Sequence, residues 1–247
     1  MLKAQPLAWA FALCCLAGPA QAETVNVAAA ANFTAAANDI EEAFEAATSH
    51  DVVFSFGSTG KLYSLIVNGA PFDAFLAADA VLPERLEGEG HAIAGTRFTY
   101  ALGTLVLWSP RPGQDLKARL LAGSYERLAI ANPKTAPYGA AAAQALEAMG
   151  LTQDASDKLV QGDSVAQTQQ FVGSGAADLG FVALAQVVLD PSGSTWLVDE
   201  GLYDTIAQQA VLLVQGADNA AALAFLKFLK GPRAVEIIRS YGYGTAE

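Results

Sequence analysis

A glycine-rich turn near residue 60 carries the residues with the clearest chemical potential. The stretch FGSTGKLY joins an apolar run, DVVFS, to a helical pattern, and it combines glycines with the hydroxyls of Ser58 and Thr59. Glycines let the backbone fold closely around a ligand, and the free N–H groups at a helix N-terminus favour negative charge. The turn therefore predicts an anion site, and the pair Gly60-Lys61 raises a nucleotide phosphate as one candidate anion.

The spacing excludes a nucleotide-binding P-loop. That motif requires G-x-x-x-x-G-K followed by Ser or Thr, because the loop amides hold the phosphates and the hydroxyl binds Mg²⁺. Counting from Gly60, Ser55 stands where the first glycine belongs, and Leu62 stands where the hydroxyl belongs. What remains is a turn suited to a smaller, free anion. Ordinary helix capping by Ser58 or Thr59 is the alternative explanation of the same turn.

The same kind of turn occurs at three further positions, each of which follows an apolar segment and opens a predicted helix. Asn32 and Thr34 lie in the first of these, Tyr138 in the second and Val165 in the third. Each helix start leaves backbone amides without an acceptor in their own helix. If two lobes bring these starts together, the converging amides form a site for a small oxyanion that needs no lysine or arginine.

Other kinds of site find little support in the residue pattern. A zinc site needs clustered His, Cys and carboxylate ligands, whereas His50 and His91 lie far apart in loop-like segments. A nucleophile elbow needs G-x-S-x-G, and in GSTG the serine comes one place early. We therefore expect no enzyme and no cofactor. A secreted hydrolase on an α/β scaffold is the alternative from a different class.

The first 22 residues have the pattern of a cleavable signal peptide. Lys3 is followed by an apolar run, 7–18, and by the A-x-A site at residues 20–22. The run is too short for a membrane span, which takes about 20 residues. Both cysteines of the chain lie in this segment, so the exported protein is expected to contain no disulfide. Export to the periplasm is the expected location.

The charge balance excludes some classes of partner. The chain has 14 basic and 25 acidic residues, a net charge of −11, and removal of Lys3 with the signal peptide makes it −12. Nucleic acids and anionic membranes bind basic surfaces, so neither is an expected partner. An anion bound by this protein must be held by local dipoles against the overall field.

The rest of the chain alternates short apolar strands with helices, a pattern typical of β-α-β units and parallel sheets. The expected strands are 24–29, 51–56, 73–78, 100–109, 127–131, 178–184 and 205–214. The expected helices are 34–47, 61–68, 82–87, 115–121, 140–149, 165–172, 219–229 and 232–240.

Two long apolar strands, 100–109 and 205–214, separate the blocks of β-α units. They predict a chain that crosses twice between two lobes. Lobe 1 then contains residues 23–108 and 209–247, and lobe 2 contains residues 109–208. The expected fold class is α/β, a two-lobed clamshell in which each lobe is a mixed, mainly parallel sheet flanked by helices, with the ligand between the lobes. A single doubly wound sheet is the alternative that the length permits.

Five blocks of the sequence resemble one known family, the periplasmic molybdate-binding proteins of ABC importers, which also take tungstate. The blocks are AAAANFTAA with DIEEAF, VVFSFGSTGKLYSLIVNGAPFDAFLAAD, ANPKTAPYGAAAAQALEAMG, DSVAQTQQFVGSGAADLGFVALAQV and FLKFLKGPRAVEIIRSYGY. Together they extend over essentially the whole mature chain. The resemblance implies the periplasmic-binding-protein clamshell, a monomer, and delivery of the anion to a membrane permease.

The resemblance also implies which residues hold the anion, a buried tetrahedral dianion bound by amides and hydroxyls. Asn32 takes the first-turn position. Ala31 stands beside it where some relatives carry Thr, so that only its amide remains. Ser58 and Thr59 take the hydroxyl positions of the glycine-rich turn. Lys61 is expected to be a bystander.

The other two turns supply backbone amides in the resembled family. Tyr138 matches the amide donor of the third turn and Val165 that of the fourth. Some relatives also place a tyrosine hydroxyl on the anion from a motif like GIVYGSD, but this chain has GFVALAQV, with Ala183 at the tyrosine position. In the branch that this chain resembles more, the hydroxyl of Tyr138 takes over that role.

A receptor for another tetrahedral oxyanion, such as sulfate or phosphate, is the alternative within the same class. A site made of donors favours a fully deprotonated ion over phosphate, which carries a proton near neutral pH and needs an acceptor. Sulfate and molybdate differ chiefly in size, so backbone amides held at fixed positions distinguish the two ions by size. A ferric-ion receptor would need several tyrosines and carboxylates at one cleft, and the tyrosines here fall mainly in predicted helices and at the C-terminal end.

Overall fold

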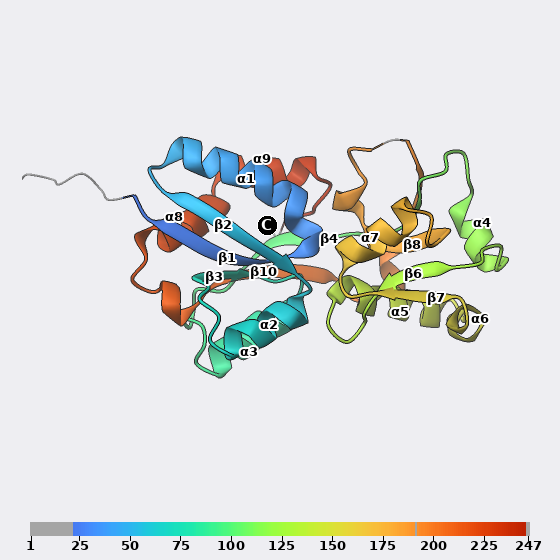
Figure 1. The fold of residues 1–247 in the computed structure, drawn as a ribbon, viewed down its shortest axis with the longest axis horizontal. Coiled ribbons are helices and arrows are strands. Elements are labelled where there is room, and N and C mark those ends of the chain that lie inside the picture. The colour runs from blue at the N-terminus through green and yellow to red at the C-terminus, as the bar shows by residue number, and fades with distance from the viewer. Residues whose placement is uncertain (1–21, 191, 246–247) are drawn as a thin grey trace, which may run out of the picture.

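The computed structural model describes residues 22–190 and 192–245. Within these ranges the chain forms two lobes, each built on a five-stranded sheet with helices against it (Figure 1). The predicted signal peptide, apart from Ala22, lies outside the described residues. No helix in the described ranges is long and apolar enough to cross a membrane.

The first lobe contains both described chain ends. Its strands are β1 (Thr24–Ala30), β2 (Asp51–Gly57), β3 (Ala74–Leu76), β4 (Phe98–Gly103) and β10 (Ile206–Leu212). Its helices are α1 (Thr34–Ala47), α2 (Thr59–Val67), α3 (Val81–Gly88), α8 (Ala220–Leu229) and α9 (Pro232–Ser240), with 3-10 turns η1 (Ala31–Phe33) and η4 (Val214–Gly216). In the sheet order β2-β1-β3-β10-β4, β1 pairs in parallel with β2 and β3, and β10 pairs antiparallel with β3 and β4.

The second lobe repeats this plan. Its strands are β5 (Leu105–Ser109), β6 (Leu128–Ala131), β7 (Leu159–Gly162), β8 (Leu179–Ala183) and β9 (Ser194–Leu197). Its helices are α4 (Leu116–Leu121), α5 (Pro137–Ala148), α6 (Thr152–Ser156) and α7 (Val165–Gly173), with 3-10 turns η2 (Leu184–Gln186) and η3 (Glu200–Leu202). In the order β7-β6-β8-β5-β9, β6 pairs in parallel with β7 and β8, and β5 pairs antiparallel with β8 and β9.

The expected two-lobed α/β clamshell with mixed sheets and two crossings is confirmed. Half of the pairings in each sheet are parallel, a smaller share than expected. The single strand expected at 100–109 is wrong, because this segment forms two strands, β4 and β5, which belong to different sheets. The short elements β7, β9 and α6 were not expected.

Sheet membership bears on where one lobe ends and the other begins. The second sheet takes β5 from Leu105, a few residues before the expected boundary at 108/109. The first sheet takes β10 from Ile206, again before the expected boundary at 208/209. We propose that the lobes meet at Thr104 and at Thr205, so that lobe 2 contains the segment between these residues.

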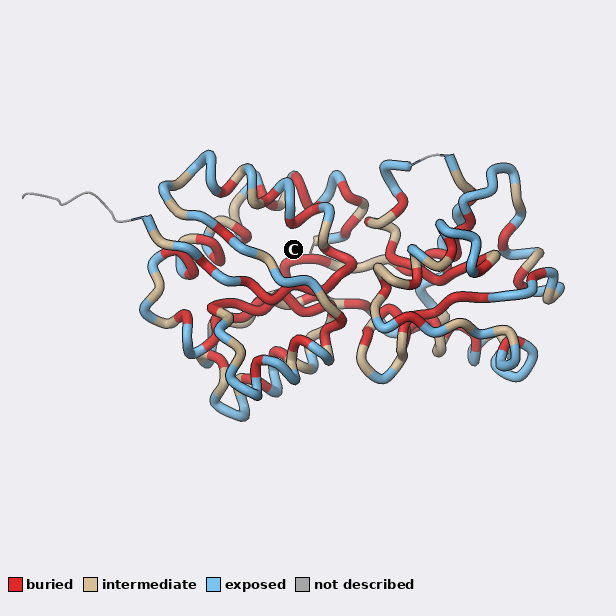
Figure 2. The backbone as a smooth tube through the Cα atoms, in the orientation of Figure 1, coloured by how far each residue is buried: buried red, intermediate tan, exposed pale blue. Residues whose placement is uncertain are grey.

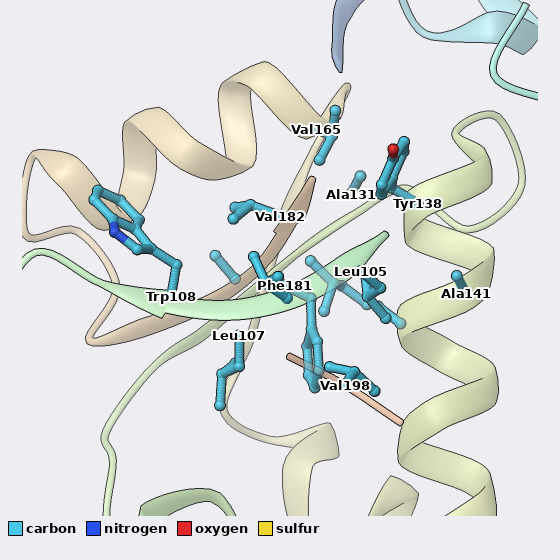
Figure 3. Close-up of a cluster of buried hydrophobic side chains, with 14 of the residues drawn as sticks. Leu105, Leu107, Trp108, Ala131, Tyr138, Ala141, Val165, Phe181, Val182 and Val198 are labelled. Atoms are coloured by element: carbon cyan, nitrogen blue, oxygen red, sulfur yellow. The ribbon is translucent and has the colours of Figure 1, made fainter. Parts of the chain in front are cut away.

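Strand periodicity explains how helices come to cover both faces of the first sheet. Along β1, Val25, Val27 and Ala29 join the core formed with α1, α8 and α9, whereas Ala28 joins the core formed with α2 and α3. Successive side chains of a strand point to opposite faces, so alternate residues serve different helices. The inner strands β3, β5, β6 and β8 are buried along their whole length, whereas the edge strands β2 and β7 are largely exposed (Figure 2). The second lobe has its own core, and Figure 3 shows Tyr138 and Val165 at one end of it.

Candidate anion-binding site

The four turns singled out in the sequence meet around one small cavity between the lobes. Its lining includes all six residues predicted for the site: Ala31, Asn32, Ser58, Thr59, Tyr138 and Val165. No charged side chain belongs to this lining, whose residues all lie in the described part of the chain. The cavity has a volume of about 10 Å³, near the minimum that one water molecule requires. The closed lobes thus leave room for about one water molecule.

Ser58 has a polar atom that the protein itself leaves without a partner. It is the N-cap residue of α2, yet its side chain makes no capping hydrogen bond. Its Oγ is buried and has no hydrogen-bond partner in the described structure, and the residue is 4% exposed. The capping explanation is therefore contradicted for Ser58. Since a buried unsatisfied polar group costs about 1–3 kcal/mol, this hydroxyl is suited to a ligand.

Thr59 has a hydroxyl at the cavity that is oriented by a hydrogen bond from the backbone. Its Oγ1 accepts a hydrogen bond of 3.1 Å from the backbone amide of Ala78, which follows β3. One lone pair of the oxygen is thus used, and the hydroxyl hydrogen is left to donate. The backbone amide of Thr59 opens α2 and has no acceptor within that helix.

The second lobe contributes two helix starts. Pro137 occupies the first turn of α5 and lacks an N–H group, so the amide of Tyr138 is the first donor of that helix. At α7, Ser164 is the N-cap and its Oγ accepts from the amide of Gln167 at 3.3 Å. Val165 follows as the first residue of α7, with its amide free of any intrahelical acceptor by position.

The side chain of Asn32, unlike the hydroxyls of Ser58 and Thr59, is fully engaged as a donor within the protein. Its side-chain Nδ2 donates to Gln208 Oε1 at 2.8 Å and to Tyr243 Oη at 3.0 Å. These two bonds use both hydrogens of the Asn32 amide, so only its backbone N–H remains for a ligand. The same holds for Ala31, which has no polar side chain and stands beside Asn32 at the start of η1.

Lys61 lies outside the cavity and joins the lobes instead. Its Nζ forms an ion pair of 2.6 Å with Asp163 Oδ2, on the loop between β7 and α7. The two side chains are 53% and 68% exposed, and exposed ion pairs contribute only about 0–1 kcal/mol.

Replacing Lys61 with alanine is therefore expected to weaken anion binding by less than about tenfold, which is under about 1.4 kcal/mol. The reason is that the substitution removes an exposed ion pair and no group that faces the cavity. Calorimetric titration of the variant measures the change, and Asp163→Asn, which breaks the same pair from the other lobe, is the matched control. A loss well above tenfold in Lys61→Ala alone would mean that its charge holds the anion.

Gly60 is one point near the cavity where the two lobes approach each other tightly. Its amide donates to Thr135 O at 2.8 Å across the lobe interface. A Cβ at Gly60 would lie 3.0 Å from Thr135 Cα and 3.1 Å from its carbonyl oxygen. Because these atoms belong to the backbone of the other lobe, they cannot move aside without opening the clamshell.

Gly60→Ala is expected to weaken anion binding by about tenfold or more, because it holds the closed lobes apart. The empty protein should be unchanged or more stable by about 0.5–1 kcal/mol, since alanine favours a helix over glycine. Titration calorimetry and thermal melts of the empty protein separate the two effects. The control is Gly88→Ala, at the end of α3, where an added Cβ meets nothing within 4 Å. Equal affinities for the two variants would contradict the account of closure.

A larger cavity of about 410 Å³ lies beside the first one and shares Ala78, Ala136 and Pro137 with it. Its lining includes the carboxylates of Asp79 and Asp204 and one basic residue, Lys134, so acidic groups outnumber basic ones. Burial raises the pKa of the Asp79 carboxyl, whose Oδ1 accepts from the amide of Leu82 at 2.8 Å. Carboxylates repel anions, so the small cavity is the better site for an oxyanion.

Sequence reasoning missed a polar group behind the cavity. Gln208 is fully buried, and it contacts Asn32, Tyr138 and Tyr100 through hydrogen bonds. Its one signal in the sequence is a pair of glutamines within an otherwise apolar strand. Tyr243, near the C-terminus, also reaches this group, and its Oη donates to Asn32 O at 2.9 Å.

The tyrosines are less scattered than the sequence indicated, since Tyr100, Tyr138 and Tyr243 converge at this group. Burial raises the pKa of each hydroxyl well above its ordinary value, so all three stay protonated at neutral pH. A ferric ion would need phenolates and carboxylates. Among the described residues, no group of three or more His, Cys, Asp or Glu could hold a metal ion.

The chain matches known proteins over most of its length. Residues 25–244 match the family described as bacterial extracellular solute-binding protein. The molybdate-binding protein ModA of Azotobacter vinelandii is 56% identical over 93% of each chain, and that of Rhodobacter capsulatus is 48% identical over 93% of this chain and 92% of the relative. A solved structure titled as the periplasmic molybdate-binding protein of Azotobacter vinelandii superposes with a TM-score of 0.86 at 43% identity, and covers 90% of this chain and 100% of that one.

These matches agree with the two-lobed fold. They are matches to binding proteins of transport systems, which agrees with the expectation that the chain is not an enzyme and that an anion is its cargo and not a cofactor. The protein belongs to the family of bacterial extracellular solute-binding proteins.

Proposed function

We propose that this protein captures molybdate, and tungstate with it, between its two lobes and delivers the anion to the membrane permease of an ABC importer. The observation that carries the proposal is the buried, unpartnered Oγ of Ser58 in a cavity lined by helix starts and free of charged side chains. Neutral donors that converge from both lobes suit a small oxyanion.

The residues that bind the anion follow from the same geometry. Ser58, Thr59 and Tyr138 donate hydroxyl hydrogens, and the amides of Thr59, Tyr138 and Val165 donate from their helix starts. The amides of Ala31 and Asn32 complete the shell from the first turn. The positions of these groups in one cavity lining support this assignment.

Molybdate is the favoured anion for two reasons. The relatives at 56% and 48% identity bear the name of molybdate-binding proteins. The donors of the cavity also suit an ion with no proton, and fixed amides on helices distinguish ions by size. A receptor for sulfate or phosphate is the alternative, which the relatives do not favour.

We also propose that the protein works in the periplasm as a monomer. The family description places such proteins outside the cytoplasm. The signal-peptide pattern of residues 1–22 supports export and cleavage after Ala22.

A thermal-shift screen of the mature protein, stripped of bound anion, tests the proposal. Molybdate and tungstate at micromolar concentration should raise the melting temperature, since ligand at 100 times its Kd stabilises the folded state by about 2.7 kcal/mol. Sulfate and phosphate should have no effect at the same concentration. Stabilisation by sulfate or phosphate alone would contradict molybdate as the cargo, and hydrolysis of ester substrates without any shift would favour an enzyme.

A further inference from the structure

Gln208 on β10 links the residues behind the cavity in both lobes. The side chain is 0% exposed, although an amide is strongly polar. Its Oε1 accepts from Asn32 Nδ2 at 2.8 Å and from Tyr100 Oη at 3.2 Å, both in the first lobe. Its Nε2 donates to Tyr138 Oη at 3.3 Å, in the second lobe. A buried polar group this well connected orients its neighbours.

The direction of each bond in this group is determined by its neighbours. Tyr243 donates its hydroxyl hydrogen to the carbonyl of Asn32, so Tyr243 Oη can only accept from the Asn32 side chain. The Asn32 side chain therefore turns its Nδ2 toward Gln208 as well. If the Gln208 amide were reversed, two NH₂ groups would face each other. Gln208 must then present Oε1 to Asn32 and Nε2 to Tyr138.

The orientation of the Gln208 amide determines which hydrogen bonds the Tyr138 hydroxyl can still make. Its oxygen accepts from Gln208, and a Cβ at Gly103 would overlap it, so it is held tightly in place. No hydrogen bond among the described residues uses the hydroxyl hydrogen of Tyr138. Tyr138 lines the cavity together with Val165, which lies near it in Figure 3. Tyr138 is thus arranged to donate to a ligand and not to accept from one.

We propose that Gln208 is a specificity-determining positioning residue, which fixes Tyr138 as a donor and thereby selects oxyanions that carry no proton. The inference rests on the proposed function, since it assumes that an oxyanion occupies the cavity. A protonated ion such as monohydrogen phosphate brings an O–H group that needs an acceptor. Tyr138 already accepts from Gln208 in a tightly packed position, so it is not available to this O–H group. The hydroxyls of Ser58 and Thr59 are then the acceptors that remain in the cavity, so fixing Tyr138 as a donor removes one of three.

The test compares sulfate with phosphate, because the two ions are similar in size and differ in the proton. Both are measured by competition against molybdate at pH 7.5, in wild type and in Gln208→Met. Methionine has a similar length but has neither the donor nor the acceptor. The preference for sulfate over phosphate should fall about tenfold. Without Gln208, the Tyr138 oxygen is free to accept from the O–H group of phosphate, so this group is no longer buried without a hydrogen bond. An equal change in both affinities would mean a purely structural role and overturn the inference.

Two further variants make the result specific. Gln209→Met is the matched control, since Gln209 is the next residue on β10 and bonds Thr99 and Arg97 instead. Its preference should equal that of wild type. Tyr138→Phe should show the same loss of preference as Gln208→Met, and adding Gln208→Met to it should change the preference no further. A further loss in the double variant would overturn the inference.

The outcomes separate this inference from the proposed function. If Gln208→Met does not fold, an unaltered preference in Tyr138→Phe overturns the inference by itself. If the wild-type protein prefers an anion other than molybdate, the proposed function fails, while the sulfate-to-phosphate ratio still decides the role of Gln208.

Discussion

Replacing Ser58 with alanine is expected to weaken molybdate binding by about 10- to 150-fold, which corresponds to the loss of a hydrogen bond to a charged group at about 1.5–3 kcal/mol. The free energy of unfolding of the empty protein should stay the same or rise slightly. The reason is that Ser58 Oγ is buried and has no partner in the described structure, so its removal takes nothing from the fold. Titration calorimetry gives the first quantity and denaturant unfolding of the empty protein gives the second.

Ser64→Ala is the matched control for this experiment. Ser64 lies on the same helix, is exposed, and bonds the carbonyl of Gly60 at 2.9 Å. Its removal should change neither quantity appreciably. If Ser58→Ala destabilised the empty protein and left affinity intact, Ser58 would be a structural residue and the site would be misassigned.

Thr59→Val should lower both the affinity and the stability. The substitution removes a hydroxyl donor to the anion, at about 1.5–3 kcal/mol, and it also leaves the buried amide of Ala78 without its acceptor, at about 1–3 kcal/mol. The acceptor role is visible in the bond of 3.1 Å from Ala78 to Thr59 Oγ1. The same two measurements as for Ser58 apply.

Thr59→Ser keeps the hydroxyl and should retain most of both quantities. The ranking against Lys61→Ala is equally informative. If Lys61→Ala cost more affinity than Thr59→Val, the anion would be held by charge and not by neutral donors. Together the two hydroxyl variants distinguish a residue that serves only the ligand from one that serves both ligand and fold.

The four helix-start turns were predictable because their signal is local. A strand that ends in small or hydroxyl residues and then enters a helix is visible in a few consecutive positions, as at Ser58 and Thr59. The bonds of the Asn32 side chain were not predictable, because its partners Gln208 and Tyr243 lie far away in the sequence. Such pairings depend on the folded chain, and no spacing rule reports them.

The fold was predictable in outline for a similar reason. Alternating strands and helices indicated two α/β lobes, and the two crossings fell near the long apolar runs. The break at Thr104 was missed because residues on both sides favour strands, and a single glycine, Gly103, is the one local mark of the change of sheet. The strands β7 and β9 were missed because each has four residues, too few for a periodic pattern to stand out.

Calorimetric titration of the stripped, mature protein with molybdate and with sulfate tests the central claim most directly. Neutral donors on closed lobes should bind a proton-free dianion and select it by size. Molybdate should therefore bind tightly and saturably, and sulfate much more weakly under the same conditions. Equal heats and equal affinities for the two ions would contradict this selection.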